Sequence, residues 1–146
     1  MNQPRLFDIA DDELLISVYQ KQGRTLDDLP YTPEFQAIYA AMIGSGDAEE
    51  PLAAMSKSDL FHRLHNLRKA GRLPRLGKAV SSPPRISSDN ETMLVGLVES
   101  AIGKLSLRDR LPFTDPFDQL VDQFNATAGL ELEHHDVWRI IAKLAK

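Results

Sequence analysis

The sequence predicts an all-α fold of two similar three-helix lobes, and three observations lead to this prediction. Apolar residues recur at helical spacing in six separate stretches. One phrase is written twice, as LDDLPYTPEF at Leu26–Phe35 and as RDRLPFTDPF at Arg108–Phe117. The copies lie 82 residues apart, and the helical patterns around them follow the same order. The matching order favours an internal duplication.

A helix is predicted before each copy of the phrase. The first runs from about Asp11 to Gln22, because acids in its first turn suit the positive end of the helix dipole and Gly23 is well placed to end it. In the second copy Asp89 is the expected cap. The side chains expected to be buried are Leu14, Leu15, Val18 and Tyr19 in the first copy, and Met93, Leu94, Leu97, Val98, Ala101 and Ile102 in the second.

The phrase itself predicts a link that sets the angle between two helices. The leucines of Leu29-Pro30 and Leu111-Pro112 are expected to anchor the link, and the prolines to hold it extended. Thr32 and Thr114 are good N-caps for the helices that follow, with Pro in the first turn. The apolar stripes of these helices are Phe35, Ile38, Tyr39 and Met42 in one copy, and Phe117, Leu120, Val121 and Phe124 in the other.

A third helix is predicted in each copy, around Asp59–Leu67 and Asp136–Leu144. Ser56 with an acid three residues later resembles a capping box, and Gly71 is well placed to end the first of these helices. The expected buried stripes are Leu60, Phe61, Leu64 and Leu67, and Val137, Trp138, Ile141 and Leu144.

The chain is therefore divided into three parts. Residues 1–73 form an N-terminal lobe with a basic last helix, residues 74–90 a linker rich in Pro, Ser and Gly, and residues 91–146 a C-terminal lobe. The stretch Gly71–Val80 leaves open a short β-hairpin ahead of the linker proper. Each half alone would have a marginal core, so the lobes are expected to pack against each other.

Composition predicts a soluble, cytoplasmic protein. There is no cysteine, so disulfides and thiolate metal sites are excluded. The N-terminus lacks a basic region followed by an apolar run, and no stretch approaches the roughly 18 apolar residues of a membrane span. Apolar residues make up 42% of the 146 residues, which is enough for a packed core.

Charge is strongly segregated along the chain. The net charge is −7 over residues 1–56, +7 over residues 57–86 and −4 over residues 87–146. A basic stretch inside an acidic chain indicates a polyanionic partner, or else a face that pairs with the acidic flanks of the same protein. The basic residues of this stretch are Lys57, Arg63, Arg68, Lys69, Arg72, Arg75, Lys78 and Arg85.

Two stretches resemble DNA-binding modules. SKSDLFHRLHNLRKAGRLPRLGKA, from Ser56 to Ala79, resembles the last helix and wing of winged-helix domains, whose last helix lies in the major groove. NATAGLELEHHDVWRIIAKL, from Asn125 to Leu144, resembles the turn and recognition helix of a helix-turn-helix. One feature departs from the pattern. The connection GSGDAEEPLAAM before the first candidate helix has 12 residues and three acids, where about three or four residues are usual.

The resemblance and the basic stretch together predict a non-enzymatic, regulatory nucleic-acid-binding protein, for DNA rather than RNA. Arg, Lys and Asn on the outward face of the third helix are the types that reach guanine, phosphate and adenine. Bases on the tail would contact the phosphate backbone. The predicted binding residues are Lys57, Arg63, Asn66, Arg68, Lys69, Arg72, Arg75 and Lys78.

A second hypothesis is a protein-interaction or assembly module whose basic segment docks an acidic partner. The last helix bears on this hypothesis, because Ile140 stands at an outward position where the first copy has Arg63. An outward apolar residue predicts packing against the first lobe or against a second subunit, which leaves open a homodimer through the C-terminal lobe.

Neither catalysis, a metal nor a cofactor is predicted. The sequence has no glycine-rich phosphate loop, no nucleophile elbow and no metalloprotease motif. His62 and His65 share a predicted helix face with only Asp59 as a nearby carboxylate, whereas the adjacent His134 and His135 point apart. These residues do not assemble a closed four-ligand site.

Overall fold

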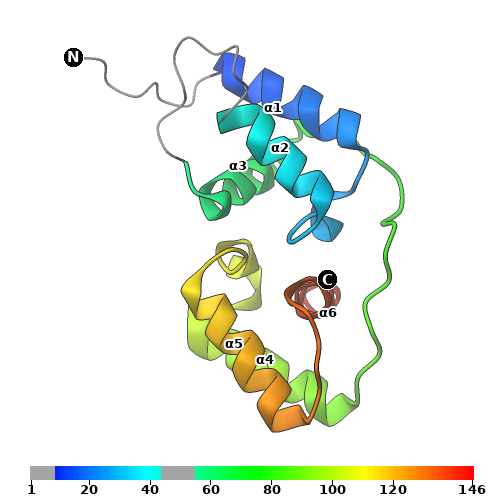
Figure 1. Cartoon of the computed structure of the whole chain (residues 1–146), viewed down its shortest axis with the longest axis vertical. Helices are drawn as coiled ribbons and strands as arrows, with labels where there is room; N and C mark the ends of the chain where they lie inside the picture. The colour runs from blue at the N-terminus through cyan, green and yellow to red at the C-terminus, as the bar shows by residue number, and fades with distance from the viewer. Residues whose placement is uncertain (1–8, 44–54) are drawn as a thin grey trace, which may run out of the picture.

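The computed structural model describes residues 9–43 and 55–146. These residues form six α-helices and two 3₁₀ helices and no β-strand, so the all-α prediction is confirmed for them (Figure 1). None of the described helices combines the length and apolar character that a bilayer span requires. The elements are α1 (Ile9–Gln22), η1 (Leu26–Asp28), α2 (Pro33–Ile43), α3 (Lys57–Lys69), α4 (Ser88–Ile102), η2 (Leu105–Arg110), α5 (Asp115–Ala128) and α6 (His134–Leu144).

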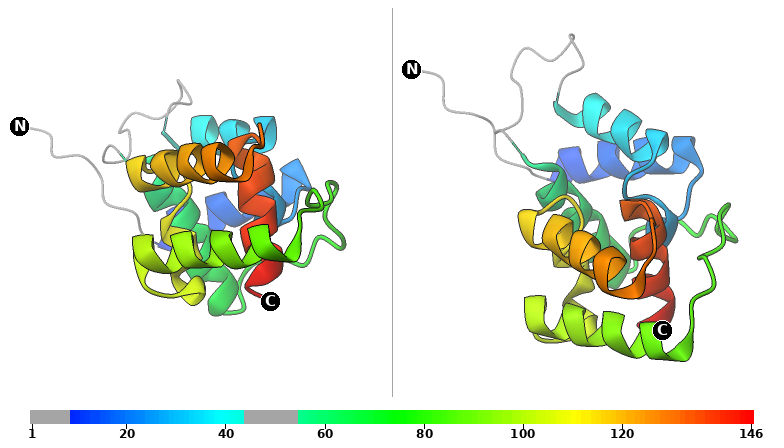
Figure 2. Two further views of the ribbon diagram at one scale, coloured as in Figure 1. Left: turned by 90° about the horizontal axis from the view of Figure 1, so that it is seen from below. Right: turned by 60° about the horizontal axis from the view of Figure 1, so that its bottom comes forward.

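The helices fall into two halves that share one interior. The first three α-helices lie in one half and the last three in the other, and residues 70–87 run along one side between them (Figures 1 and 2). Within the halves α1 packs on α2, and α4 packs on α5. The third helices join the halves, because α3 packs against η2, and α6 packs against η1 as well as against α4, α5 and η2 of its own half. Each half therefore completes the core of the other.

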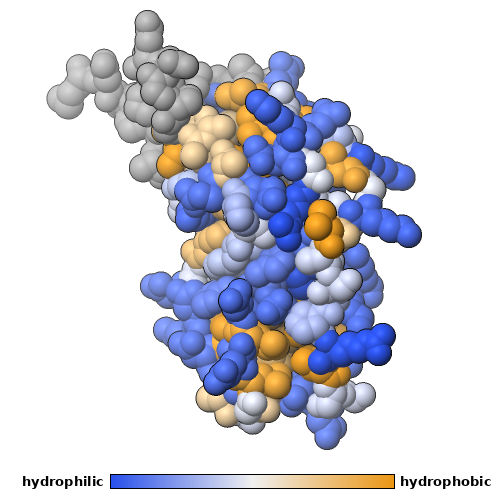
Figure 3. Space-filling model, turned by 45° about the vertical axis from the view of Figure 1, so that its right-hand side comes forward, coloured by the Kyte–Doolittle hydropathy of each residue, from blue (hydrophilic) through white to orange (hydrophobic). Residues whose placement is uncertain are grey.

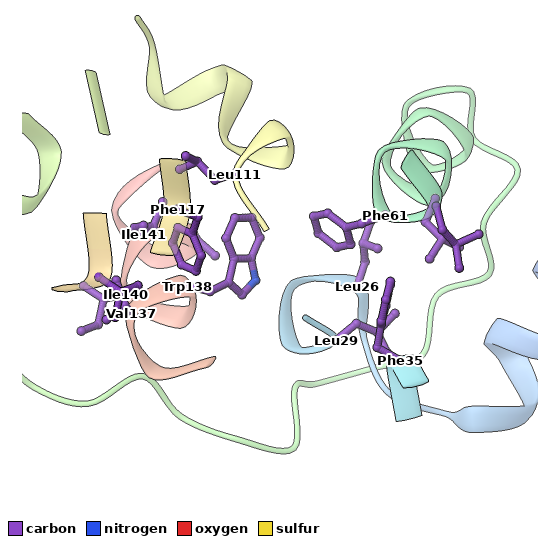
Figure 4. Packing of buried hydrophobic residues seen from close by; sticks show 14 of the residues in the cluster. Leu26, Leu29, Phe35, Phe61, Leu111, Phe117, Val137, Trp138, Ile140 and Ile141 are labelled. Atoms are coloured by element: carbon purple, nitrogen blue, oxygen red, sulfur yellow. The ribbon is translucent and has the colours of Figure 1, made fainter. Parts of the chain in front are cut away.

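Two large aromatic side chains meet at the junction of the halves. Phe61 of α3 and Trp138 of α6 are both fully buried, and their rings lie 5.4 Å apart at 89° (Figure 4). Most of the apolar positions predicted from helical spacing are buried or half-buried. The prediction was wrong for Leu14, which is 48% exposed, and for Ala101.

The two copies of the repeated phrase fold alike. Tyr31 and Phe113, at matching positions, have φ values of 66° and 67°, in the left-handed region that side chains rarely adopt. The hydroxyl of Thr32 donates to the Leu29 carbonyl at 2.6 Å and accepts from the Phe35 amide at 3.2 Å. Thr114 makes the same pair of bonds at 2.6 and 3.3 Å. Both threonines therefore cap the helices that follow them.

The Leu-Pro link is turned rather than extended, which corrects the prediction. Leu29 and Leu111 are fully buried as expected, but their ψ values are −44° and −49°, in the right-handed helical region. Proline disfavours this conformation in the residue before it. The bond from each threonine hydroxyl back to the leucine carbonyl closes the turn and holds it.

The two copies also contact each other. The Tyr31 ring lies 4.4 Å from that of Phe113, and its hydroxyl accepts a hydrogen bond from the Phe113 amide at 2.5 Å. Phe113 stacks in turn on Phe35, with 4.5 Å between the ring centroids. The repeated phrase thus forms a contact between the halves as well as a link within each.

The β-hairpin left open for Gly71–Val80 does not form, since residues 71–87 contain no strand. Pro74 has no N–H to donate to a partner strand. The amides of Val80 and Ser81 donate instead to the carboxylate of Asp28, at 3.1 and 3.0 Å. The segment is therefore an extended connection that is pinned at one end by a side chain.

Ile140 is 2% exposed, so its predicted outward position was wrong. Pro84 and Ile86 of the connection line one cavity of about 340 Å³ together with Ile140, and Ile86 packs on the core. The connection therefore covers this side of α6. The apolar surface on which the homodimer prediction rested is buried within the chain.

Candidate nucleic-acid interface

The predicted interface begins with α3, whose ends are fixed by local bonds. The Ser56 hydroxyl accepts from the Asp59 amide at 3.0 Å. At the other end Gly71 has φ 73°, and the Arg72 amide donates to the Leu67 carbonyl at 2.9 Å, which is the Schellman pattern. The basic residues after α3 therefore leave the helix in a defined direction.

Arg63 and Arg72 both bind one buried carboxylate. Asp12 of α1 is 1% exposed. Nε of Arg63 donates to it at 2.7 Å and Nη2 makes a second, short bond, while Nη1 of Arg72 lies 3.3 Å away. Two of the eight predicted binding residues thus serve first to compensate an acid of their own chain.

Arg68 is held by two neighbours. Its Nη1 donates to the Asp27 carboxylate at 3.2 Å, and its Nη2 lies 2.9 Å from Nε2 of His65. Because arginine only donates, His65 must accept through that nitrogen and is neutral. Burial, with the charge of Arg68, lowers the pKa of His65 to about 4.

The depressed pKa of His65 predicts a loss of stability in mild acid. The unfolded chain binds a proton at this histidine below pH about 6.5, whereas the folded chain binds it only below about 4. Stability contributed by the neutral form should therefore fall as the pH drops from 6.5 to 4, by on the order of 3 kcal/mol in total. Urea unfolding at a series of pH values measures it. A His65→Leu variant should lose this part of the pH profile, and an unchanged profile would contradict the assignment.

Lys57 lies away from the other predicted binding residues, and Asn66 is partly covered. Nζ of Lys57 lies 5.7 Å from the ring centroid of Tyr39 and 5.9 Å from that of Phe113, as in a cation–π contact. Lys57 is twelve residues from Lys69, which is about 18 Å along a helix. Asn66 is half-buried on α3, one turn before Lys69.

Lys69, Arg75 and Lys78 are the most available of the predicted residues. All three side chains are exposed. None of them forms a salt bridge in the part of the chain that the structure describes. They follow one another from the last turn of α3 along the connection. The face drawn in Figure 3 is a mixture of hydrophilic residues and apolar patches.

A cavity of about 830 Å³ lies beside these residues, between η1, the end of α3, the connection and α6. Asp27 is the one acidic side chain in its lining. The lining also includes apolar side chains, among them Leu26, Leu73 and Leu76. The basic side chains in the lining are Arg68, Arg75 and Lys78 from the predicted set, and Arg139 and Lys146 from the C-terminal half.

The prediction did not include Arg139 and Lys146. Arg139 is 7% exposed, and its guanidinium donates to the carbonyls of Asp27 at 3.3 Å and Ser81 at 3.0 Å. Lys146 is 68% exposed, with Nζ 3.9 Å from the Asp27 carboxylate. One signal was present in the sequence, because Lys146 aligns with Lys69 in the repeat.

Asp28 fixes the far end of the cavity wall. Its fully buried carboxylate accepts from the Val80 and Ser81 amides and from the Ser81 hydroxyl. Burial alone would raise the pKa of this carboxyl, but the bonds from Ser81 and Arg24 outweigh it and place the pKa below its usual value. The charged carboxylate therefore holds residues 73–79 over the cavity.

The remaining histidines also have carboxylate partners, and that of His135 is Asp28, which lies 3.2 Å from its Nε2. Nδ1 of His62 makes a short contact with the buried carboxylate of Asp109, and Nε2 of His134 lies 2.9 Å from Asp118. Among the described residues, no group of three or more His, Cys, Asp or Glu side chains is placed to hold a metal ion. The chemistry that the described surface offers is therefore the binding of anions by arginine and lysine.

Comparison with known proteins supplies no relative for this chain: no family model, no curated protein and no solved structure matches it.

Proposed function

We propose that this protein is a non-enzymatic nucleic-acid-binding protein that holds the phosphate backbone of DNA. The observation that carries the proposal is the cationic surface around the cavity, where five basic side chains face one acidic side chain. Lys69 extends this surface on α3. Phosphate contacts of this kind supply affinity without reading sequence.

The eight predicted binding residues are not expected to contribute equally to ligand binding. Arg63 and Arg72 share Asp12, so they contribute less positive charge to a ligand than their number suggests. In the proposal Arg68, Lys69, Arg75 and Lys78 make the principal contacts, and Lys57 and Asn66 are peripheral. The likeness to winged-helix domains supports a role for α3 only, since no hairpin follows it.

The shared folding of the two phrase copies supports the proposal that the chain arose by duplication of a half-length unit. Such a unit would have paired with a second copy of itself. The contacts of α3 with η2 and of α6 with η1 fit that origin, because each third helix packs against the other half. After duplication one half kept the basic third helix and the other kept Ile140 and its covering connection.

Nucleic-acid binding is tested by fluorescence anisotropy with a labelled random-sequence duplex of about 20 base pairs at several salt concentrations. We expect affinity to fall steeply with salt. The double variant Arg75→Ala/Lys78→Ala should bind more weakly and lower the slope of log K against log salt by about 1.8, or about 0.9 for each lost contact.

The control is Arg85→Ala/Lys104→Ala, which removes two exposed bases that do not line the cavity. It should leave affinity and slope close to those of the unchanged protein. Absence of binding at low salt, or an equal loss in the control variant, would overturn the proposal.

An acidic protein segment is the second candidate partner. The half-buried leucines Leu73 and Leu76 in the cavity lining favour it, because they can pack on apolar side chains of a peptide. Purification separates the two candidates. Bound nucleic acid raises absorbance near 260 nm, whereas a protein partner appears as a second band.

A further inference from the structure

We propose that the cavity between α3, the connection and α6 binds a terminal phosphate group, meaning the phosphomonoester at the end of a nucleic-acid strand or of a free nucleotide. This inference rests on the proposed function and names the part of the ligand that this cavity holds. The observation behind the proposal is that basic side chains from both halves line the same cavity. Arg139 and Lys146 come from the C-terminal half, and Arg68, Arg75 and Lys78 come from the N-terminal half and the connection.

The charge balance favours a terminal phosphate over an internal one. The lining side chains carry five positive charges and one negative charge. An internal phosphodiester has a single negative charge, whereas a phosphomonoester has between one and a half and about two at neutral pH. A concentrated positive surface with partly apolar walls therefore gains more from the monoester. The volume of about 830 Å³ lies within the range of small-molecule sites.

The inner cations are already held in place. Arg68 is fixed by Asp27 and His65, and Arg139 by the carbonyls of Asp27 and Ser81. Ordering these side chains therefore costs little when a ligand binds. Lys146, at the rim and mostly exposed, is free to approach a phosphate from the other half.

Nε of Arg139 faces the buried carboxylate of Asp28 at 3.5 Å, so this arginine is also held by an acid of its own chain. Its positive charge is therefore shared between Asp28 and a ligand in the cavity.

Removing the charge of Asp27 provides a test in which phosphate binding should become tighter rather than weaker. Its carboxylate is the acid that Arg68 and Lys146 face when no ligand is bound. A phosphate must share these cations with it. Asp27→Asn keeps the backbone carbonyl that Trp138 and Arg139 use and removes the competing charge. The variant should therefore bind phosphate more tightly, whereas loss of a base should weaken binding.

The experiment compares two single-stranded 12-mers of one sequence, with a 3′ fluorescent label and either a 5′-phosphate or a 5′-hydroxyl. Anisotropy should show that the phosphorylated strand binds about tenfold more tightly, since hydrogen bonds to a charged group are among the stronger ones. Lys146→Glu should abolish this preference and Asp27→Asn should increase it. The matched control is Lys143→Glu, the same charge change three residues earlier, on α6 and outside this cavity, which should preserve it.

Adenosine 5′-monophosphate as competitor identifies the source of the phosphate. Displacement of the strand at micromolar concentration assigns the site to free nucleotides, and displacement only at millimolar concentration assigns it to strand ends. Equal binding of both 12-mers, with the Arg75→Ala/Lys78→Ala effect retained, overturns the terminal-phosphate site and leaves the proposed function standing. A monophosphate that binds while neither 12-mer binds supports the site and overturns nucleic-acid binding.

Discussion

Trp138→Ala is expected to lower the free energy of unfolding by about 4 kcal/mol, within the range for buried tryptophan. The indole is fully buried at the junction, perpendicular to Phe61, and its Nε1 donates to the Asp27 carbonyl at 2.8 Å. Alanine leaves a cavity where the two halves meet, and it removes one of the bonds that position η1. Urea unfolding followed by circular dichroism measures the change.

Trp138→Phe is the matched control, because it keeps a ring against Phe61 and removes only the indole N–H and part of the volume. It should cost about 1 to 2 kcal/mol. Because Trp138 is the sole tryptophan, its fluorescence in the unchanged protein reports directly on the junction. A cost below about 1 kcal/mol for Trp138→Ala would mean that the halves do not depend on this contact.

Asp28→Ala is expected to destabilise the protein by about 3 to 5 kcal/mol, the usual result when one partner is removed from a buried charged network. The change leaves the Val80 and Ser81 amides without their acceptor, and it removes the carboxylate partner of Arg24 on η1, where only the bond to the Asp28 carbonyl remains. It should also release the wall of the cavity. Thermal or urea unfolding measures the stability loss, and phosphate binding measures the loss of the wall.

The stability contributed by Asp28 depends on pH, and the direction of this dependence follows from the lowered pKa of its carboxyl. The stability that this carboxylate contributes is present above its unfolded pKa of about 4 and is lost as the pH falls through its lower folded pKa. Asp28→Asn should remove that dependence. Asp122→Ala, an exposed acid on α5, is the control and should change stability by less than about 0.5 kcal/mol. An equally small effect at Asp28 would contradict the assigned role.

Local features of the fold were predictable from the sequence because their causes lie within a few residues. Thr32 and Thr114 cap the helices after the phrase, as their type and position indicate. Ser56 and Gly71 bound α3 as expected. The cap of α4 is Ser87 rather than Asp89, a difference of two residues between equally good caps.

Contacts between residues that are far apart in the chain were not predictable from the local sequence. Sequence spacing placed Ile140 at an outward position and left His65 out of the buried stripe of its helix, and both are buried. Spacing identifies one apolar stripe on a helix, but a helix that is covered by two other elements buries two faces. The pairing of Arg63 with Asp12, 51 residues away, has no local signal at all.

The sequence by itself determined the six helices, the matching of the two phrase copies and the concentration of positive charge in residues 57–86. The tertiary structure decided where that charge is available. It paired Arg63 and Arg72 with an acid of α1, and it brought Arg139 and Lys146 beside Arg75 and Lys78. The reason is physical: helix formation depends on near neighbours, whereas a surface potential depends on which charges the folded chain brings together.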